Sequence, residues 1–417
     1  MSPLAPLGDT QASILAAVSP LESTTVALAD ALGLVLAAPV HAREDVPPFA
    51  NTAMDGYAVR AADTLGAGPD APVRLRVVAE LPAGHAPEVP VAVGEAIRIM
   101  TGAPMPDGAD AVVIVERTAR VAGADDVVDV AAVVEPGNHV RRAGGDLTAG
   151  QLVFDAGTVL RAAHVGVLAS VGAATVEVTR RPRVGVLSTG DELVPVEADA
   201  ASAALAPGQI RDSNRPMLLD LVREAGLEPV DLGVARDDED RIVALLDDAF
   251  GRCDAVLTSG GVSVGDYDFV KAALDRFGAL EWRQVAIKPA KPLAFGVVRG
   301  VPVFGLPGNP VSSLVSFELF ARPALLRMGG HAVCHRPEVV ATATEDLHRR
   351  ADGKLHLDRV HVRWVDDRYV VGRTGDQASN VLSATALANG LALLPDGDGV
   401  SAGDTVRVML LTAPPEV

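Results

Sequence analysis

The stretch from residue 181 to residue 330 alternates short apolar runs with longer amphipathic runs, and this pattern constrains the fold more than any other. Short apolar runs bounded by glycine or proline are typical of buried strands, and the amphipathic runs have the length of helices. Such alternation predicts βαβ units around a mostly parallel sheet. The predicted strands are 184–187, 229–234, 255–257, 282–287 and 301–304, and the predicted helices are 216–225, 239–250, 266–277 and 311–327.

The flanking regions follow other patterns. Residues 71–140 contain short β-rich runs at 73–78, 111–115 and 127–134, separated by proline and glycine turns. The residues after His331 alternate in a similar way, which predicts a small β-barrel or sandwich. Residues 9–36 have the apolar spacing of helices. The sequence therefore predicts a multidomain α/β plus β protein.

Charge and amino-acid usage limit the partners. The formal net charge is -18, so we expect no nucleic-acid partner, because a broad basic surface is missing. Only four of the 36 basic residues are lysines, and two of these, Lys288 and Lys291, lie three positions apart. Lysine provides a compact positive charge, which suits a phosphate or a metal oxyanion. The alternative is a solvated loop in which the lysines have no ligand.

The cysteines and the apolar runs indicate the compartment. Cys253 and Cys334 lack the spacing of a zinc site or a redox pair, which fits free thiols in a reducing cytoplasm. The first 18 residues lack the basic segment of a secretory signal, and no run is apolar enough for a membrane span. We therefore expect a cytoplasmic protein without a membrane segment.

Four polar loops follow predicted strands, at 188–192, 258–263, 288–291 and 306–313. In a parallel sheet such loops gather at the carboxyl edge, where ligands bind in open α/β folds. Their hydroxyls, glycines and free backbone N–H groups suit an oxyanion, and Pro310 stands at the start of a predicted helix. One such loop alone would be an ordinary strand–helix turn, but four at one edge predict a pocket.

Five acidic residues are candidates for a cation site: Asp55, Asp146, Glu192, Asp237 and Asp268. Clustered carboxylates bind Mg²⁺ through hard oxygen ligands. The sequence alone does not bring the five together, and each by itself is typical of a solvated surface. Asp55 and Thr101 lie in two further specific strings, 51–59 and 99–106, which read locally as β-turns.

Eight strings, in the same order as in the family, resemble the MoeA family of molybdopterin molybdenumtransferases, to which the C-terminal part of gephyrin is related. They cover most of the chain and are NTAMDGYAVR (51–60), RIMTGAPMP (98–106), RRAGGDL (141–147), GVLSTGDEL (185–193), GQIRDSN (208–214), SGGVSVGDYDFVK (259–271), IKPAKP (287–292) and GLPGNPVSSLVSFELF (305–320).

The resemblance implies four domains. These are a split N-terminal linker and dimerisation domain (1–50 and 145–180), a β-rich inserted domain (51–144), an α/β molybdopterin-binding domain (181–330) and a C-terminal β domain (331–417). It also implies an elongated homodimer whose active site lies in a cleft between the α/β domain of one subunit and the β-rich domain of the other. That arrangement would explain why the specific strings at 51–60 and 98–106 lie so far in sequence from the α/β domain.

The family's functional residues carry over by motif. Those expected to be catalytic are Asp55, Thr101, Glu192, Asp237, Asp268, Lys288 and Lys291, with Glu192, Asp237 and Asp268 as Mg²⁺ ligands. Those expected to bind substrate are Arg141, Asp146, Ser188, Thr189, Gly190, Ser259, Gly260, Gly261, Ser263, Pro307, Gly308, Asn309, Pro310 and Ser379. The register between Asp237 and Asp238 stays open. Three positions depart from the family: Ala50 replaces a common aspartate, Ala290 the usual glycine between the lysines, and Asn380 a frequent histidine.

The resemblance implies an Mg²⁺-dependent transferase that inserts molybdenum from molybdate into adenylylated molybdopterin and releases AMP. It also implies contact with the adenylyltransferase acting before it. Two alternatives remain open: a scaffold that holds finished cofactor without turnover, and another nucleotide-processing enzyme on the same α/β unit. A scaffold gains nothing from the extra carboxylates, and the second alternative does not require the strings at 51–60 and 98–106.

Overall fold

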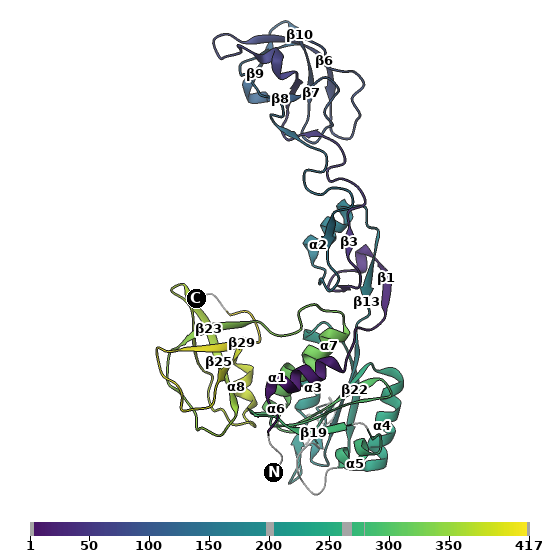
Figure 1. The fold of residues 1–417 in the computed structure, drawn as a ribbon, viewed down its shortest axis with the longest axis vertical. Coiled ribbons are helices and arrows are strands. Elements are labelled where there is room, and N and C mark those ends of the chain that lie inside the picture. Colours follow the sequence, from purple (N-terminus) through teal and green to yellow (C-terminus); the bar gives the residue numbers. More distant parts are fainter. Residues whose placement is uncertain (1–3, 197–203, 261–268, 279, 415–417) are drawn as a thin grey trace.

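The computed structural model describes the 417-residue chain except for residues 1–3, 197–203, 261–268, 279 and 415–417. The molecule is elongated (Figure 1). A β-sheet domain lies at one end, a small domain follows in the middle, and an α/β domain and a C-terminal β domain lie side by side at the other end. The chain passes through the middle domain twice, on its way to the β-sheet domain and on its return.

The α/β domain is built on a six-stranded sheet. In spatial order its strands are β17 (Glu228–Ala235), β14 (Arg183–Thr189), β18 (Ala255–Ser259), β22 (Val301–Leu306), β21 (Pro292–Val298) and β19 (Leu280–Gln284). The first four are parallel, and β21 runs antiparallel to both neighbours. The predicted mostly parallel sheet is therefore confirmed.

Helices cover both faces of this sheet. Apolar residues of α3 (Asn214–Glu224) and α6 (Pro310–Ser316) join one core, and those of α4 (Glu239–Arg252) and α5 (Phe269–Asp275) join the other. After α6 the helical run continues through the π-helical turn η4 (Phe317–Ala321) into α7 (Arg322–Met328). Pro216 is the third residue of α3 rather than the first, which is tolerated because the N–H groups of a first turn have no partner within the helix.

Two predictions around this sheet were wrong in detail. The predicted strand at 282–287 is divided, because β19 ends at Gln284 and β20 (Ile287–Lys288) pairs with the C-terminal domain instead. β21 was missed, because its apolar residues follow a proline-rich stretch that indicated only a loop. β21 is buried between β22 and β19, so it needs no alternation of polar residues.

The helical prediction for 9–36 holds only for α1 (Leu7–Ala16). Residues 23–27 form the strand β1 (Ser23–Ala27), which fits the β-branched residues Thr24, Thr25 and Val26. α1 packs on α7, and its Ile14 belongs to the α/β core, although the predicted boundary groups residues 1–50 with the split domain.

The middle domain joins β1, β13 (Thr175–Thr179) and β2 (Val35–Leu36) with α2 (Ala162–Ser170) and the short turn η1 (Leu28–Asp30). Two short ladders connect it to the far end, β3 (Val40–His41) with β12 (Leu152–Phe154), and β4 (Asn51–Thr52) with β11 (Val140–Arg141). The inserted sheet has the order β8 (Ala111–Ile114), β5 (Gly56–Val59), β7 (Glu95–Ile99), β6 (Val73–Leu81), β10 (Ala124–Val130) and β9 (Thr118–Val121), with the turns η2 (Ala61–Thr64) and η3 (Val115–Arg117).

The C-terminal domain is a closed barrel, as predicted. Its strands are β25 (Leu355–Val365), β26 (Arg368–Arg373), β23 (Glu338–Ala343), β29 (Thr405–Leu410) and β27 (Gly390–Leu394), and pairing of β27 with β25 closes the sheet. Smaller elements are α8 (Leu382–Ala386) and the pairs β24 (Leu347–His348) with β28 (Gly399–Val400) and β15 (Leu193–Val194) with β16 (Ile210–Arg211). Within the described residues, no helix is both long and apolar enough to cross a membrane.

Candidate functional site

Three of the predicted loops meet at the carboxyl edge of the parallel strands. The amide of Asn214, at the start of α3, donates to Ser259 Oγ at 2.8 Å and to the Gly308 carbonyl at 2.7 Å. Gly260 N donates to the carbonyl of Leu306, and a Cβ on Gly260 would lie 2.8 Å from the Thr189 carbonyl. The loops at 188–192, 259–260 and 307–310 therefore lie against one another, as the sheet topology predicts.

The hydroxyls of these loops form hydrogen bonds within the protein. Ser188, Thr189 and Ser259 are buried, and Ser188 Oγ donates to Asp212 Oδ1 at 3.1 Å. Ser259 Oγ accepts from Asn214, which sequence reasoning did not single out although it ends the GQIRDSN string. Gly308 and Asn309 are exposed, whereas Pro307 is buried and Pro310 begins α6. The three hydroxyls thus lie inside the loops that they connect, and Gly308 and Asn309 are among the exposed residues of these loops.

The acidic side chains at this edge fall into two kinds. Asp191 Oδ1 accepts from Asp237 N at 3.2 Å, and Asp237 Oδ2 accepts from Asp191 N at 3.4 Å. Asp238 instead begins α4 and accepts from Arg241 N at 3.0 Å, so its carboxylate is occupied as a helix cap. The geometry therefore places Asp237, rather than Asp238, against the loop that carries Glu192.

Glu192 is exposed, and its carboxylate lies over Gly190 so closely that a Cβ at position 190 would collide with it. Gly190 has a φ of 147°, which few other residues adopt. Among the described residues no group of three potential ligands gathers closely enough to hold a metal ion. Gly261, Ser263 and Asp268, the last a predicted metal ligand, lie outside the described residues.

Lys288 and Lys291 line a pocket of about 920 Å³ between the α/β domain and the C-terminal barrel. Neither lysine forms an ion pair within the part of the chain that the structure describes. Lys288 lies in β20, whose parallel pairing with β25 sets Lys288 opposite His356. The loop between the lysines is buried and holds Ala290 at a φ of 73°, which explains why glycine would suit this position.

Ser379 joins this pocket to the glycine-rich loops. Its Oγ accepts from Asn309 Nδ2 at 3.0 Å, and its carbonyl accepts from Val311 N at 3.2 Å. Ser379 therefore holds the C-terminal domain against the start of α6, and it also lines the pocket. The lysine pocket and the glycine-rich loops thus form one continuous region.

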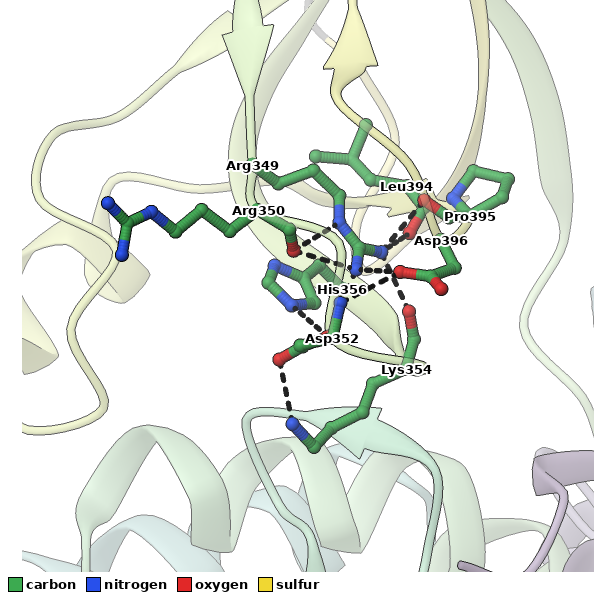
Figure 2. Close-up of polar contacts among 8 residues, drawn as sticks. All are labelled: Arg349, Arg350, Asp352, Lys354, His356, Leu394, Pro395 and Asp396. Atoms are coloured by element: carbon green, nitrogen blue, oxygen red, sulfur yellow. Dashed lines mark hydrogen bonds and ion pairs between the residues drawn. The ribbon is translucent and has the colours of Figure 1, made fainter.

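The barrel wall of the pocket was largely missed by sequence reasoning. Its six basic residues are Arg349, Arg350, Lys354, His356, Arg359 and Arg373. The Arg349 side chain is almost fully buried and donates to the carbonyls of Lys354, Leu394 and Pro395 and to the carboxylates of Asp352 and Asp396 (Figure 2). Figure 2 shows the Arg350 side chain extending away from this network. Arg349 thus fixes the loop that presents Arg350 and Lys354 at the pocket.

Two buried basic groups face the same pocket. Arg359 is 1% exposed, donates through Nη2 to the carbonyls of Asp376 and Ala378, and has no partner for Nε within the described chain. Burial lowers the pKa of His356, and the charges of Arg349 and Lys288 lower it further, while Asp352 at 3.2 Å opposes them. A buried guanidinium with an unused donor is what an anionic ligand would complement.

A signal for this wall was available in the composition. Three of the four lysines, Lys288, Lys291 and Lys354, line the one pocket. Sequence spacing does not connect Lys354 with the other two, because more than 60 residues separate it from them. The ladder between β20 and β25 that brings them together is a non-local pairing, which local patterns do not reveal.

A second polar group lies in the inserted domain. Asp55 Oδ1 accepts from both the backbone N and the Oγ1 of Thr101, each at 2.7 Å. These two bonds, together with the charge of Arg98, hold the pKa of Asp55 below its ordinary value. Arg141 is exposed and pairs with Asn51 in the β4–β11 ladder, and the exposed Asp146 donates its backbone N to Val46.

The structure thus sorts the predicted residues into two regions of one chain. Asp55 directly precedes β5 and Thr101 closely follows β7, in the sheet at the far end of the molecule from β22 and α6 (Figure 1). The lysine pocket and the glycine-rich loops lie together at the other end. A single copy of the chain does not bring the two regions into contact.

The fold and this distribution of polar groups define an elongated protein built around a molybdopterin-binding type of α/β domain. Three family models match the chain: "MoeA N-terminal region (domain I and II)" over residues 5–172, "Probable molybdopterin binding domain" over 185–327 and "MoeA C-terminal region (domain IV)" over 341–411. The chain belongs to the MoeA family.

Relatives and solved structures agree with this assignment. "Molybdopterin molybdenumtransferase 2" of Mycobacterium tuberculosis (strain ATCC 25618 / H37Rv) is 42% identical over 93% of this chain and 95% of its own length. "Molybdopterin molybdenumtransferase" of Bacillus subtilis (strain 168) is 34% identical over 94% of this chain and 90% of its own. The crystal structure of the molybdopterin biosynthesis moeA protein from Pyrococcus horikoshii OT3 matches with a TM-score of 0.83 at 30% identity, covering 98% of this chain and 100% of that chain.

Proposed function

We propose that this protein is a cytoplasmic transferase of molybdenum cofactor biosynthesis. It inserts molybdenum from molybdate into adenylylated molybdopterin and releases AMP. The observation that carries the proposal is the pocket lined by Lys288, Lys291 and Lys354, beside the exposed Gly308 and Asn309. The relatives named above support the reaction type, and the free Cys253 and Cys334 fit a reducing compartment.

The chemical problem is to bring several anions together. The reactants are a pterin dithiolate, a tetrahedral dianion and a phosphoanhydride, and in water their charges keep them apart. Lys288 and Lys291 are free of ion pairs in the described chain, so their charges are available to a ligand. Fixed positive charges in a partly enclosed pocket lower the energy of bringing the reactants together and of the charge that develops as AMP leaves. A buried Arg359 adds a charge that costs little reorganisation.

The acidic loops offer carboxylate oxygens, which are the ligands that Mg²⁺ prefers. Asp191 and Asp237 each use one carboxylate oxygen on the other's backbone, which leaves hard oxygen donors beside the exposed Glu192. We propose that Glu192, Asp237 and Asp268 hold the ion. When bound, it neutralises phosphate charge at the anhydride. The protein's own part is to hold these loops in place through Asn214.

The separation of the two polar regions supports a homodimer. Asp55 and Thr101 lie too far from the lysine pocket to serve it in the same chain (Figure 1). We propose that Asp55 and Thr101 of one copy complete the pocket of a second copy. Asp55 then supplies a carboxylate that is ionised at neutral pH, and its lowered pKa keeps it ionised further into the acidic range. The partner that supplies the substrate would be the adenylyltransferase acting before it.

The direct test uses purified protein, adenylylated molybdopterin and molybdate. We expect AMP release that requires molybdate, that falls when EDTA removes divalent ions, and that Mg²⁺ restores. The Lys288→Ala variant should keep its unfolding temperature and lose most of the activity, whereas Lys271→Ala, outside the pocket, serves as a control for the loss of a lysine. Absence of molybdate-dependent AMP release by the wild-type protein would contradict the proposal and favour a passive scaffold. Unchanged turnover in Lys288→Ala would remove Lys288 from the site.

A further inference from the structure

Arg98 lies directly behind the turn that presents Asp55. In the β5–β7 ladder Arg98 stands opposite Tyr57, and Gly56 stands opposite Ile99. Arg98 Nη1 donates to the Gly56 carbonyl at 2.7 Å and to the Ile99 carbonyl at 3.4 Å. Its guanidinium carbon also lies 5.2 Å from the centre of the Tyr57 ring. All its described polar contacts are thus with the main chain and the ring next to Asp55.

The surroundings leave little freedom to this turn. The Asp55 carbonyl accepts from Val115 N at 3.2 Å, and Gly56 is packed so tightly against Val113 that no side chain would fit. Both hydrogen bonds from Thr101 go to Asp55 Oδ1, so Oδ2 carries no hydrogen bond within the described chain. The direction of Oδ2 is therefore set jointly by the Thr101 bonds to Oδ1 and by the main chain at Gly56, the next residue, whose carbonyl Arg98 holds.

We propose that Arg98 is a positioning residue that holds the Gly56 carbonyl and thereby directs the free oxygen of Asp55 toward the substrate. This inference rests on the proposed function. Arg98 itself does not touch the reacting atoms. Its Nη1 donates to two carbonyls while the planar guanidinium lies over the Tyr57 ring, which a lysine can do only in part.

The expected effect on catalysis is specific. Arg98→Met keeps the length of the side chain but removes the donors and the charge. We expect kcat for AMP release to fall about tenfold, the loss expected for one well-placed hydrogen bond, with KM changed less than about twofold. Loss of a nearby cation raises the pKa of a carboxylate. The acid limb of the pH–rate profile should therefore move to higher pH, and Arg98→Lys should recover part of both effects.

Hydrogen exchange at the Thr101 amide gives a readout that is independent of activity. This amide donates to Asp55, so loosening of the turn should speed its exchange about tenfold in Arg98→Met. The matched control is Arg120→Met, because Arg120 lines the same shallow pocket as Arg98 but is exposed and contacts neither Asp55 nor Gly56 in the described chain.

The outcomes distinguish failure of the proposed function from failure of the role assigned to Arg98. If the wild-type protein releases no AMP, the proposed function fails, while Thr101 exchange still decides whether Arg98 holds the turn. If the wild type is active and Arg98→Met matches Arg120→Met in kcat, pH profile and Thr101 exchange, the role of Arg98 is overturned. If Arg98→Met loses activity but keeps the wild-type pH profile and Thr101 exchange, Arg98 does not act through Asp55, and the proposal is again overturned.

Discussion

At the scale of single residues, the role of a polar side chain depends on whether its atoms are already hydrogen-bonded within the protein. Ser188, Thr189 and Ser259 have the residue types expected of an anion site, yet they are buried and hold loops together. Asp237 and Asp238 are neighbours in sequence, but only Asp238 caps a helix. The candidate residues were therefore predictable from the sequence. Whether each polar group is already hydrogen-bonded depends on contacts between loops, which the sequence does not reveal.

Asp55→Asn separates the charge of this residue from its structural contacts. Asparagine keeps Oδ1 as an acceptor for both bonds from Thr101, so we expect the unfolding temperature to change by less than about 2 °C. Loss of the negative charge should lower kcat/KM at least about 100-fold. The matched control is Asp63→Asn in the same domain, where the carboxylate also accepts a backbone bond, from Gly94 N. Full activity in Asp55→Asn would remove this residue from the site.

At the scale of elements, most strands and helices of the α/β domain follow from periodicity, because each is buried on a face that its own sequence specifies. α4 matches its prediction closely, and β14 and β22 extend the predicted strands by a few residues. The errors lie where distant segments decide the outcome. β20 leaves its own sheet for the barrel, and β1 exists because it pairs with β13 about 150 residues later.

Gly56 tests whether the tight packing of β5 sustains the inserted sheet. A Cβ there would overlap the Val113 carbonyl, which belongs to the rigid neighbouring strand β8. We expect Gly56→Ala to destabilise this sheet by about 3 kcal/mol, measured by denaturant unfolding. Gly166, in α2, has open space around its Cα. Gly166→Ala should instead stabilise by about 0.5–1 kcal/mol. Equal stability of the two variants would contradict the packing described for β5.

At the scale of the whole molecule, the joint between the middle domain and the α/β domain sets the reach of the inserted sheet. Arg180 donates to both oxygens of Asp254, at 2.7 and 2.8 Å, and to Glu22 at 2.6 Å. A Cβ at Gly330 would collide with Thr179, so the two domains touch here without room for a side chain. The chain has a net charge of -18, yet three of its four lysines line one pocket.

This joint should weaken in acid. Burial alone would raise the pKa of Asp254, but the hydrogen bonds from Arg180 and from Arg183 N outweigh it and lower the pKa below the ordinary value. A lowered pKa in the folded state stabilises the fold above the ordinary aspartate range, and this contribution is lost as the pH falls below about 4. We expect Arg180→Met to lower the unfolding temperature at pH 7 and to differ less from the wild type at pH 3. A difference that is the same at both pH values would exclude the ion pair as its source.

The central claim is that each active site combines the lysine pocket of one copy with Asp55 of another. Co-expression of Asp55→Asn and Lys288→Ala chains with two different affinity tags yields purified heterodimers. Each such heterodimer contains one intact site and one doubly altered site, so we predict about half of the wild-type AMP release. A heterodimer of Lys288→Ala with Lys291→Ala has no intact site and should stay inactive. If the first heterodimer is no more active than its two parent variants, the shared site is contradicted.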